Sequence, residues 1–340
     1  MTESTATERT IDERLEHYLR TRERGGRAPE IRALTGDASD RRYFRVSFAG
    51  EASTVVAVHA APIDFATSPF ANVAELFKQI PLPVPQILGH SDGDGVIEQT
   101  DLGDLTLQAH IPQADAAEQR RLYTEAVALI VQLQRRGAEL ASERYIPYRI
   151  AFDVEKLTWE MNFFVRHFLE AYCGAAISDT TRQQLAEEWQ ALVGELAAEP
   201  RVLCHRDYHS RNLMVVDRRL HVIDFQDARM GPDTYDLVSL LRDSYVELAD
   251  EEVDVLIDVF RRLRPVTTAE TEFRRRFDLM ALQRNLKALG TFGYQATTRA
   301  NPVYAQYVPR TLQYARRPLE RYPRFARLRA LLAAHVAELS

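Results

Sequence analysis

The chain has 340 residues, 46% of them hydrophobic and 27% charged, and 49 acidic against 43 basic residues give a net charge of −6. The length suits two lobes, and the composition excludes a largely disordered protein. An acidic chain has no general attraction for nucleic acid or an anionic membrane, and no obligate protein partner is implied. Two cysteines favour a reducing compartment, and no apolar run is long enough for a transmembrane helix. The N-terminus also lacks a secretory layout, so we expect a cytoplasmic protein.

The first hundred residues are expected to form a small β-rich part. Alternating or β-branched runs between turn residues predict five strands, at 30–34, 42–48, 54–59, 86–89 and 96–99. One short helix is expected over 72–79. The Asp-Gly-Asp-Gly segment at 92–95 predicts a hairpin turn between the last two strands.

After residue 104 the apolar spacing becomes helical. It predicts helices around 122–133, 157–172, 180–199, 234–248, 251–263, 272–297 and 325–338. One β-rich island, Val202–Phe225, interrupts this helical part. We therefore expect an α+β, two-lobed fold with a β-rich lobe over 11–100 and a larger helical lobe over 101–340.

Polar residues stand where the strands of the island end. The sequence reads His-Arg-Asp-Tyr-His-Ser-Arg-Asn at 205–212 and Ile-Asp-Phe at 223–225. Asp207 follows the first apolar strand, Asn212 precedes the second and Asp224 ends the third. Phosphoryl transfer needs a carboxylate to accept the hydroxyl proton and oxygen ligands to hold Mg²⁺. The spacing gives the kinase order of base, amide ligand and carboxylate ligand, so we predict these roles for the three residues in a kinase that uses ATP and Mg²⁺.

The plain alternative is a hairpin whose Asp and Asn residues only favour turns. A lone His-Arg-Asp would not exclude it, but the Asn at the correct offset between apolar strands argues for the kinase reading. His205 is expected to brace the loop rather than to bind metal. His209 and Arg211 lie inside the loop and either face substrate or are exposed loop side chains.

A phosphate-covering loop is predicted between the first two strands. There Ser39 offers a hydroxyl, and Arg41 and Arg42 offer guanidinium donors suited to phosphate; the alternative is a plain solvated turn. A kinase usually carries a lysine on its third strand, where this chain has His59. A neutral imidazole is a poorer phosphate partner, so an arginine of this region, including Arg45, is the alternative cation.

Residues 30–315 resemble the aminoglycoside phosphotransferase/choline kinase-like family of protein-kinase-fold enzymes. The resemblance implies ATP between a β-rich and a helical lobe, with a hinge at 98–103 that meets the adenine and includes Glu98 and Thr100. The sequence is most similar to a bacterial subgroup of anomeric kinases for N-acetylmuramate and N-acetylglucosamine in cell-wall recycling. The stretches that carry this likeness are 36–46, 205–214, 223–228, 235–243 and 283–290. The subgroup also lacks the third-strand lysine.

Substrate residues are predicted in two places. Gln226 and Asp227 directly follow the predicted metal ligand and could reach a sugar hydroxyl or amide. Glu155 and Trp159 lie on a helix expected to border the acceptor pocket, where carboxylates bind hydroxyls and an aromatic ring stacks on a sugar. The alternatives are a solvated helix charge for Glu155 and a core position for Trp159.

The sequence thus predicts an ATP- and Mg²⁺-dependent small-molecule kinase, with the anomeric hydroxyl of an N-acetylated amino sugar as the preferred acceptor. Two other functions stay open. One is a kinase of another alcohol, such as an aminoglycoside or choline. The other is a nucleotide-binding pseudokinase, which the missing lysine motivates and the presence of Asp207, Asn212 and Asp224 opposes.

Overall fold

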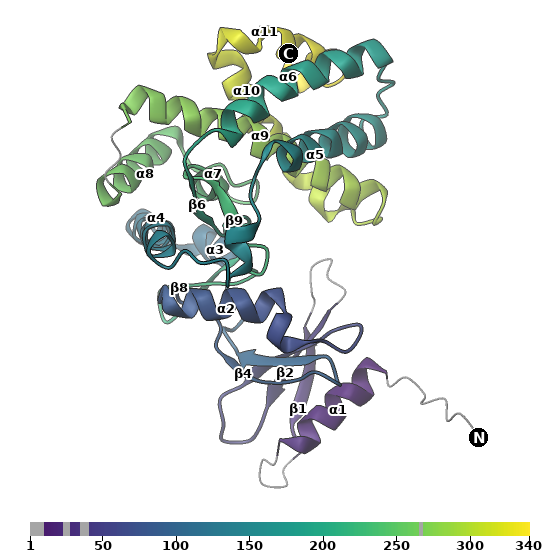
Figure 1. The fold of residues 1–340 in the computed structure, drawn as a ribbon, viewed down its shortest axis with the longest axis vertical. Helices are drawn as coiled ribbons and strands as arrows, with labels where there is room; N and C mark the ends of the chain where they lie inside the picture. The colour runs from purple at the N-terminus through teal and green to yellow at the C-terminus, as the bar shows by residue number, and fades with distance from the viewer. Residues whose placement is uncertain (1–9, 23–27, 35–40, 265–267) are drawn as a thin grey trace, which may run out of the picture. The chain divides into compact units, whose positions relative to one another are not determined.

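The computed structural model describes residues 10–22, 28–34, 41–264 and 268–340, so the predicted Ser39 contact lies outside the described residues. The chain divides into two compact units (Figure 1). The first comprises Met1–Asp104 and His221–Gln226, and the second comprises Leu105–Leu220 and Asp227–Ser340. The roles assigned to lobes at 11–100 and 101–340 stay predictions.

The first unit is built on a five-stranded antiparallel sheet in the order β1-β2-β3-β5-β4. Its strands are β1 (Glu30–Leu34), β2 (Arg42–Ser47), β3 (Thr54–Val58), β4 (Ile87–Ser91) and β5 (Val96–Thr100). All five predicted strands are therefore confirmed. Every residue of β3 is buried, which explains its unbroken apolar run.

Two α-helices complete the first unit, α1 (Ile11–Thr21) and α2 (Pro69–Gln79). Helix α1 was missed by the sequence analysis, which expected strands and turns here. Its signals are a capping box, in which Thr10 and Glu13 bind each other's backbone, and the helical spacing of Leu15 and Tyr18. These two side chains pack on the sheet with Phe44, Val46, Phe48, Val56, Val58 and Val96.

The segment His221–Gln226 packs into the first unit, although it lies late in the sequence. The backbone amide of Val222 donates to the carbonyl oxygen of Pro83 at 2.7 Å. The ring of Phe225 stacks on Phe70, with the centroids 5.0 Å apart, and contacts Phe77 on α2. The predicted metal ligand Asp224 is thus carried by the first unit.

The second unit is mainly helical, with short strands between its helices (Figure 1). Its α-helices are α3 (Leu107–His110), α4 (Ala116–Glu139), α5 (Val154–Phe164), α6 (Asp179–Ala197), α7 (Tyr235–Leu241), α8 (Asp250–Leu263), α9 (Glu270–Thr297), α10 (Val308–Arg321) and α11 (Ala326–Ala333). A π-helix, Val165–Tyr172, continues α5. The short strands are β6 (Arg201–Cys204), β7 (Leu213–Val216), β8 (Arg219–Val222) and β9 (Arg229–Pro232), paired as β6-β9 and β7-β8.

The helical prediction holds for the long elements, but it missed helices α3 and α10, and strand β9 was also not predicted. Helix α10 has Pro309 in its first turn, where proline is tolerated, but Pro318 lies inside the helix and argues against it in sequence reasoning. Tertiary packing overrides that signal, because α10 packs along α9 and buries Leu312, Tyr314 and Leu319.

Helix α9 is the central element of the second unit and packs against α5, α7, α10 and the π-helix. Two glycines let it approach the α5 region closely. A Cβ atom at Gly290 would lie 2.9 Å from the Cα of Phe164, and one at Gly293 would overlap the carbonyl oxygen of His167. The side chains of α9 that precede these glycines are therefore held at a fixed distance from α5.

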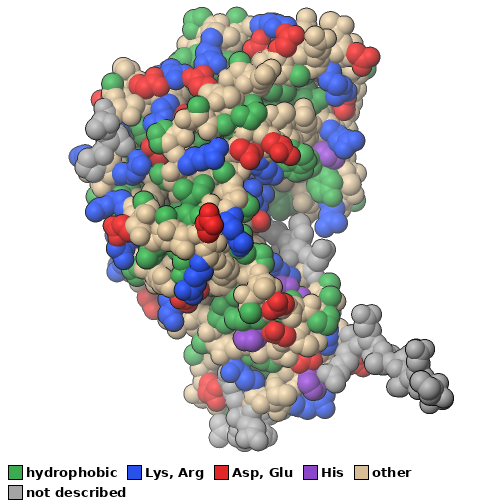
Figure 2. Space-filling model, in the orientation of Figure 1, with side chains coloured by type: hydrophobic (Ala, Val, Ile, Leu, Met, Phe, Trp, Pro, Cys, Tyr) green, Lys and Arg blue, Asp and Glu red, His purple; other side chains and the backbone are tan. Residues whose placement is uncertain are grey.

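Figure 2 shows basic and acidic side chains interspersed on the visible face of the second unit, without a large area of one sign. Arg327 and Glu187 of this unit form one such exposed ion pair of opposite charges, at 2.8 Å. In the part of the chain that the structure describes, no helix combines the length and apolar character needed to span a bilayer.

We predict that Gly293→Ala lowers the midpoint of thermal unfolding, because the added methyl group has no space against the backbone at His167. Overpacking of this kind costs roughly 1–3 kcal/mol. The matched control is Gly194→Ala in α6, where nothing lies within 4 Å of the added methyl group. Alanine is favoured over glycine inside a helix by roughly 0.5–1 kcal/mol, so this control should unfold at a slightly higher temperature. Calorimetry that gives both variants the same shift would contradict the close packing.

Candidate functional site

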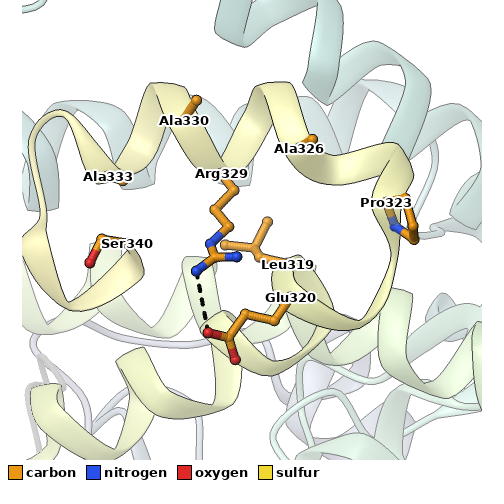
Figure 3. Close-up of a pocket in the computed structure, with 8 residues that line it drawn as sticks. All are labelled: Leu319, Glu320, Pro323, Ala326, Arg329, Ala330, Ala333 and Ser340. Carbon is orange, nitrogen blue, oxygen red and sulfur yellow. Dashed lines mark hydrogen bonds and ion pairs between the residues drawn. The ribbon is translucent and has the colours of Figure 1, made fainter.

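A hollow at α10 and α11 is lined by small and apolar side chains and has a volume of about 370 Å³ (Figure 3). Its polar content includes Arg329, whose Nη2 donates to Glu320 Oε1 at 3.3 Å. None of the predicted site residues lines it. The predicted catalytic loop at 205–212 lies elsewhere in the second unit.

A second cavity, of about 300 Å³, lies at that loop. The loop contributes Asp207 and His209, α5 contributes Trp159 and Glu160, and α9 contributes Arg284 and Lys287. The predicted base and two predicted substrate residues thus line one cavity of the second unit.

A buried carboxylate holds the loop from inside the protein. Asp236, on α7, is fully buried, and its two oxygens accept the backbone amides of His205 at 2.6 Å and Arg206 at 3.0 Å. Arg206 has a φ of 85°, a left-handed conformation that is strained for a non-glycine residue. The two hydrogen bonds stabilise this turn, which fixes where the next residue, Asp207, projects.

Two further bonds fix the rest of the loop. Asn212 Nδ2 donates to the backbone oxygen of Asp207 at 2.9 Å. The buried carboxylate of Asp243 accepts the backbone amides of Ser210 and Tyr245, each at 2.9 Å. His205 is itself 1% exposed and packs edge-on against Tyr208, as expected of a bracing residue.

The carboxylate of Asp207 lies between two cations. Lys287 Nζ is 3.4 Å from its Oδ1, and Arg206 Nε is 3.7 Å from its Oδ2. Burial pushes the pKa of Asp207 upward, but Lys287 and Arg206 outweigh it and hold the pKa well below its usual range. Asp207 is therefore ionised at neutral pH, which is the state a proton acceptor needs.

The two other predicted loop residues have different environments. Burial, with the charge of Arg284, lowers the pKa of His209 to about 3, so its imidazole is neutral at pH 7. The guanidinium of Arg211 lies over the rings of Tyr245 and Tyr304, 4.9 and 5.6 Å from their centroids. Substrate contacts of both residues stay predictions.

The α5 wall of the cavity differs from the expected one. Trp159 is 54% exposed, so it is not a core residue, and Lys156 Nζ lies 4.0 Å from its ring centroid. Glu155 is exposed on the first turn of α5 and does not line the cavity. Glu160, which is 1% exposed, lines it instead and accepts a hydrogen bond from Gln283 Nε2 at 2.9 Å.

The residues that follow the Ile-Asp-Phe motif have local partners. Gln226 Nε2 donates to Asp224 Oδ1 at 2.7 Å within the first unit. Asp227 Oδ2 lies 2.7 Å from Arg206 Nη1 within the second unit, where it orients the cation beside Asp207. Their predicted contacts with a sugar stay predictions.

In the first unit, the side chains of the predicted hinge are already occupied. Glu98 is 1% exposed, and its carboxylate accepts hydrogen bonds from Tyr18 and from Arg22 Nε, both at 2.9 Å. The hydroxyl oxygen of Thr100 accepts the amide of Gln86 at 3.0 Å. A nucleotide contact at this hinge would therefore come from the backbone.

The structure distinguishes the residues that could replace the third-strand lysine by their charge and by their partners. Burial and neighbouring arginines lower the pKa of His59 to about 4, so it is neutral at pH 7. Arg45 is bound to Asp101 at 2.5 and 2.9 Å and to Asp104 at 2.8 and 3.0 Å. Arg42 is half-exposed and pairs with Asp12 at 3.2 Å. Arg41 and Arg42 keep their predicted phosphate role.

Residues 30–274 match the phosphotransferase enzyme family, which is more than half of the chain. The chain belongs to this family. The phosphotransferase is 37% identical to an N-acetylmuramate/N-acetylglucosamine kinase of Neisseria meningitidis serogroup B, over 91% of each chain. It is 31% identical to a kinase of the same name from Pseudomonas aeruginosa, over 90% of this chain and 88% of the relative.

Solved structures confirm the predicted protein-kinase-like fold. A choline/ethanolamine kinase family protein from Mesorhizobium loti has a TM-score of 0.61 at 15% identity, over 97% of this chain and 99% of that one. An ADP-bound aminoglycoside phosphotransferase has a TM-score of 0.57 at 15% identity, over 89% and 97%. The phosphotransferase is thus a small-molecule kinase, and a family of this kind implies ATP as the co-substrate.

The predicted ligands of the phosphotransferase fit Mg²⁺ by their chemistry. Asp224 offers carboxylate oxygens and Asn212 an amide oxygen, which are the hard donors that Mg²⁺ prefers. Within the described ranges, no group of three or more His, Cys, Asp or Glu side chains could hold a metal ion. Mg²⁺ seldom occupies an all-protein cage, and its ligation by Asn212 and Asp224 stays a prediction.

Among the residues that line the cavity of the phosphotransferase, Arg284 and Lys287 on α9 were not predicted as site residues. The sequence contains a signal for the lysine. The chain has only three lysines; Lys287 lines this cavity, and Lys156 lies over the ring of Trp159, which also lines it. Arginine is the basic residue at almost every other position. A lysine that contacts Asp207 therefore marks a place where a compact ammonium is retained.

We predict that Asp236→Ala destabilises the phosphotransferase and lowers its turnover by more than a hundredfold, because two buried amides lose their acceptor and Asp207 loses its fixed position. An unsatisfied buried donor costs about 1–3 kcal/mol. Asp258→Ala, an exposed carboxylate on α8, is the control and should change stability by less than about 0.5 kcal/mol. Chemical denaturation and steady-state rates measure both effects. Wild-type turnover in Asp236→Ala would refute the loop-anchoring role.

Proposed function

We propose that this phosphotransferase transfers the γ-phosphoryl group of ATP to the anomeric hydroxyl of N-acetylmuramate or N-acetylglucosamine. The observation that carries the proposal is the cavity in which an ionised Asp207 and an exposed Trp159 occur together. Relatives that bear the corresponding name over nine-tenths of the chain support the choice of acceptor. A cavity of about 300 Å³ is at the lower end for small-molecule sites, which favours one sugar ring over a multi-ring aminoglycoside.

In the proposed reaction, Asp207 orients the acceptor hydroxyl and accepts its proton as the oxygen bonds to the γ-phosphorus. The bond from that phosphorus to the bridging oxygen breaks, and ADP leaves. Lys287 and Arg206 make Asp207 a weak base. An anomeric hydroxyl is more acidic than an ordinary alcohol, so it matches a weak base better than choline or an aminoglycoside hydroxyl does.

The sugar ring is proposed to stack on Trp159, whose exposed indole offers an apolar face of the right size. Glu160 and His209 line the same cavity and supply hydrogen-bonding groups for hydroxyl or acetamide contacts. A neutral His209 both donates and accepts, which suits a sugar better than a phosphate.

Asn212 and Asp224 are proposed to hold Mg²⁺, which when bound neutralises the charge of the nucleotide phosphates. Arg41 and Arg42 are proposed to contact those phosphates, together with the backbone of Glu98 and Thr100 at the adenine. Consumption of ATP fits a cytoplasmic enzyme.

The function is tested by incubating the protein with ATP, Mg²⁺ and one acceptor at a time, and by identifying products with ³¹P NMR. The panel is N-acetylmuramate, N-acetylglucosamine, choline and kanamycin. A sugar 1-phosphate from the amino sugars alone is the expected result. A phosphorylated choline or kanamycin would replace the acceptor. Nucleotide binding without any transfer would favour the pseudokinase.

We predict that Asp207→Asn lowers kcat by about a thousandfold, because the isosteric amide cannot accept the proton; general-base groups contribute about 10²–10⁴. The dissociation constant of ATP should stay within about threefold, since the substitution leaves the shape of the loop unchanged. Rapid-quench rates and calorimetric titration give the two quantities. Near-wild-type turnover would rule out Asp207 as the base.

We predict that Lys287→Met moves the acidic limb of the pH–rate profile to higher pH. Burial raises the pKa of Asp207 and Lys287 opposes it, so removal of the ammonium lets the pKa rise toward its ordinary value. The base works ionised, and activity is lost as the pH falls through its pKa. The wild type should therefore keep its activity to lower pH than the variant.

Lys78→Met, at an exposed position on α2, is the matched control because it removes another of the three lysines. Its profile of kcat/KM from about pH 3 to about pH 8, a range that includes the ordinary pKa of an aspartate, should coincide with that of the wild type. Coincident profiles for all three proteins would show that Lys287 does not tune the base.

A further inference from the structure

Arg284 is the one cavity residue whose charge the protein leaves without a direct partner among the described residues. It lies on α9 and is 5% exposed, and its Nε is buried without a hydrogen-bond partner. No carboxylate of the described chain lies within ion-pair distance of its guanidinium. A buried guanidinium with unpaired donors is costly and requires an explanation.

Other arginines of α9 show the usual solution. Arg276, which is 7% exposed, places Nη2 2.9 Å from Glu199 and 2.5 Å from Asp233. Arg275, two turns and a half before Arg284, pairs with Glu272 at 2.8 Å and also with Glu195. The same helix therefore pairs its arginines wherever they meet protein alone.

The carboxylates that influence Arg284 are engaged elsewhere. Asp236 accepts the amides of the loop, Asp243 accepts those of Ser210 and Tyr245, and Asp207 pairs with Lys287. They balance the charge of Arg284 at a distance, because its field lowers the pKa of each of them. None of these three carboxylates accepts a hydrogen bond from Arg284, and Arg284 lines the cavity.

We infer that Arg284 binds a carboxylate of the acceptor, and that the site is built for an acidic sugar. The inference rests on the proposed function and deepens it. N-acetylmuramate carries a lactyl carboxylate that N-acetylglucosamine lacks, and the planar fork of a guanidinium matches a carboxylate with two parallel hydrogen bonds.

The position of Arg284 on its helix agrees with this assignment. Arg284 and Lys287 are three residues apart, so they share one face of α9 with an axial offset of about 4.5 Å. Lys287 lies at the base, where the hydroxyl reacts, and Arg284 lies one turn away from it. One sugar can therefore present its reacting hydroxyl to Asp207 and its carboxylate to Arg284.

The test compares both acceptors on Arg284→Gln. We expect kcat/KM for N-acetylmuramate to fall at least about 30-fold, mainly through KM, as for a buried charge pair that loses one partner. For N-acetylglucosamine the value should change less than about threefold, because no carboxylate is involved. Arg284→Lys should recover part of the loss. The matched control is Arg275→Gln on the same helix, which should leave both acceptors unchanged.

A second measurement uses the unmodified protein and a changed substrate. The methyl ester of N-acetylmuramate keeps the lactyl group and removes its charge, so its KM with the wild type should rise to that of the acid with Arg284→Gln. This arm decides the question even where the variant does not fold.

The other outcomes overturn the inference. An equal fall in kcat for both acceptors would assign Arg284 to the transferred phosphoryl group. An equal fall together with a lowered unfolding midpoint would make its role structural. Equal KM values for the acid and its ester would exclude carboxylate recognition. Absence of wild-type activity with either sugar would instead refute the proposed function itself.

Discussion

The carboxylate of Asp236 carries the geometry of the site. It is fully buried on α7, and it binds two successive backbone amides at the point where the chain turns through a left-handed residue, Arg206. Such a turn persists only when its surroundings over-determine it. Because Asp207 is the next residue, its position is set by hydrogen bonds that do not involve substrate. The base is thus preorganised on the protein's own frame, which reduces the reorganisation required when an acceptor binds.

The strength of the base follows from the charges around this frame. Asp207 lies between Lys287 and Arg206, and Arg206 is in turn held by Asp227. An acid so stabilised in its ionised form has little affinity for a proton, so in the proposed reaction it would act by orienting the hydroxyl and by accepting the proton late. Phosphoryl transfer tolerates a weak base because its transition state is loose and places little charge on the attacking oxygen.

Sequence reasoning succeeded for the features that depend on the succession of neighbouring residues. Strand ends bearing Asp207, Asn212 and Asp224 follow from apolar runs and the spacing between polar residues, and the five strands of the first unit follow from alternation. Helix α1 was also within reach, because Thr10 and Glu13 form a capping box that sequence reasoning overlooked. Helix α10 was not, since the internal Pro318 opposes a helix and only the packing of α10 on α9 shows why one forms.

Cavity residues from α9 were beyond sequence reasoning for a different reason. Arg284 and Lys287 are about 80 residues from the loop, and nothing in their neighbourhood marks them as facing Asp207. Their placement depends on how closely α9 approaches α5, which Gly290 and Gly293 permit. The stretch 283–290 was recognised in the sequence as part of the family resemblance. The sequence did not show which of its side chains line the cavity.

The charge balance of the cavity links catalysis to the choice of acceptor. Lys287 lies beside Asp207 and lowers the pKa of that carboxylate, so it is not available to neutralise a second anion without weakening that effect. Arg284 has no such role, and its buried Nε has no hydrogen-bond acceptor among the described residues. A carboxylated sugar would satisfy Arg284 and leave the pair of Lys287 and Asp207 intact. The site can therefore recognise a charged substrate and retain a weak base, because separate cations on one face of α9 serve the two tasks.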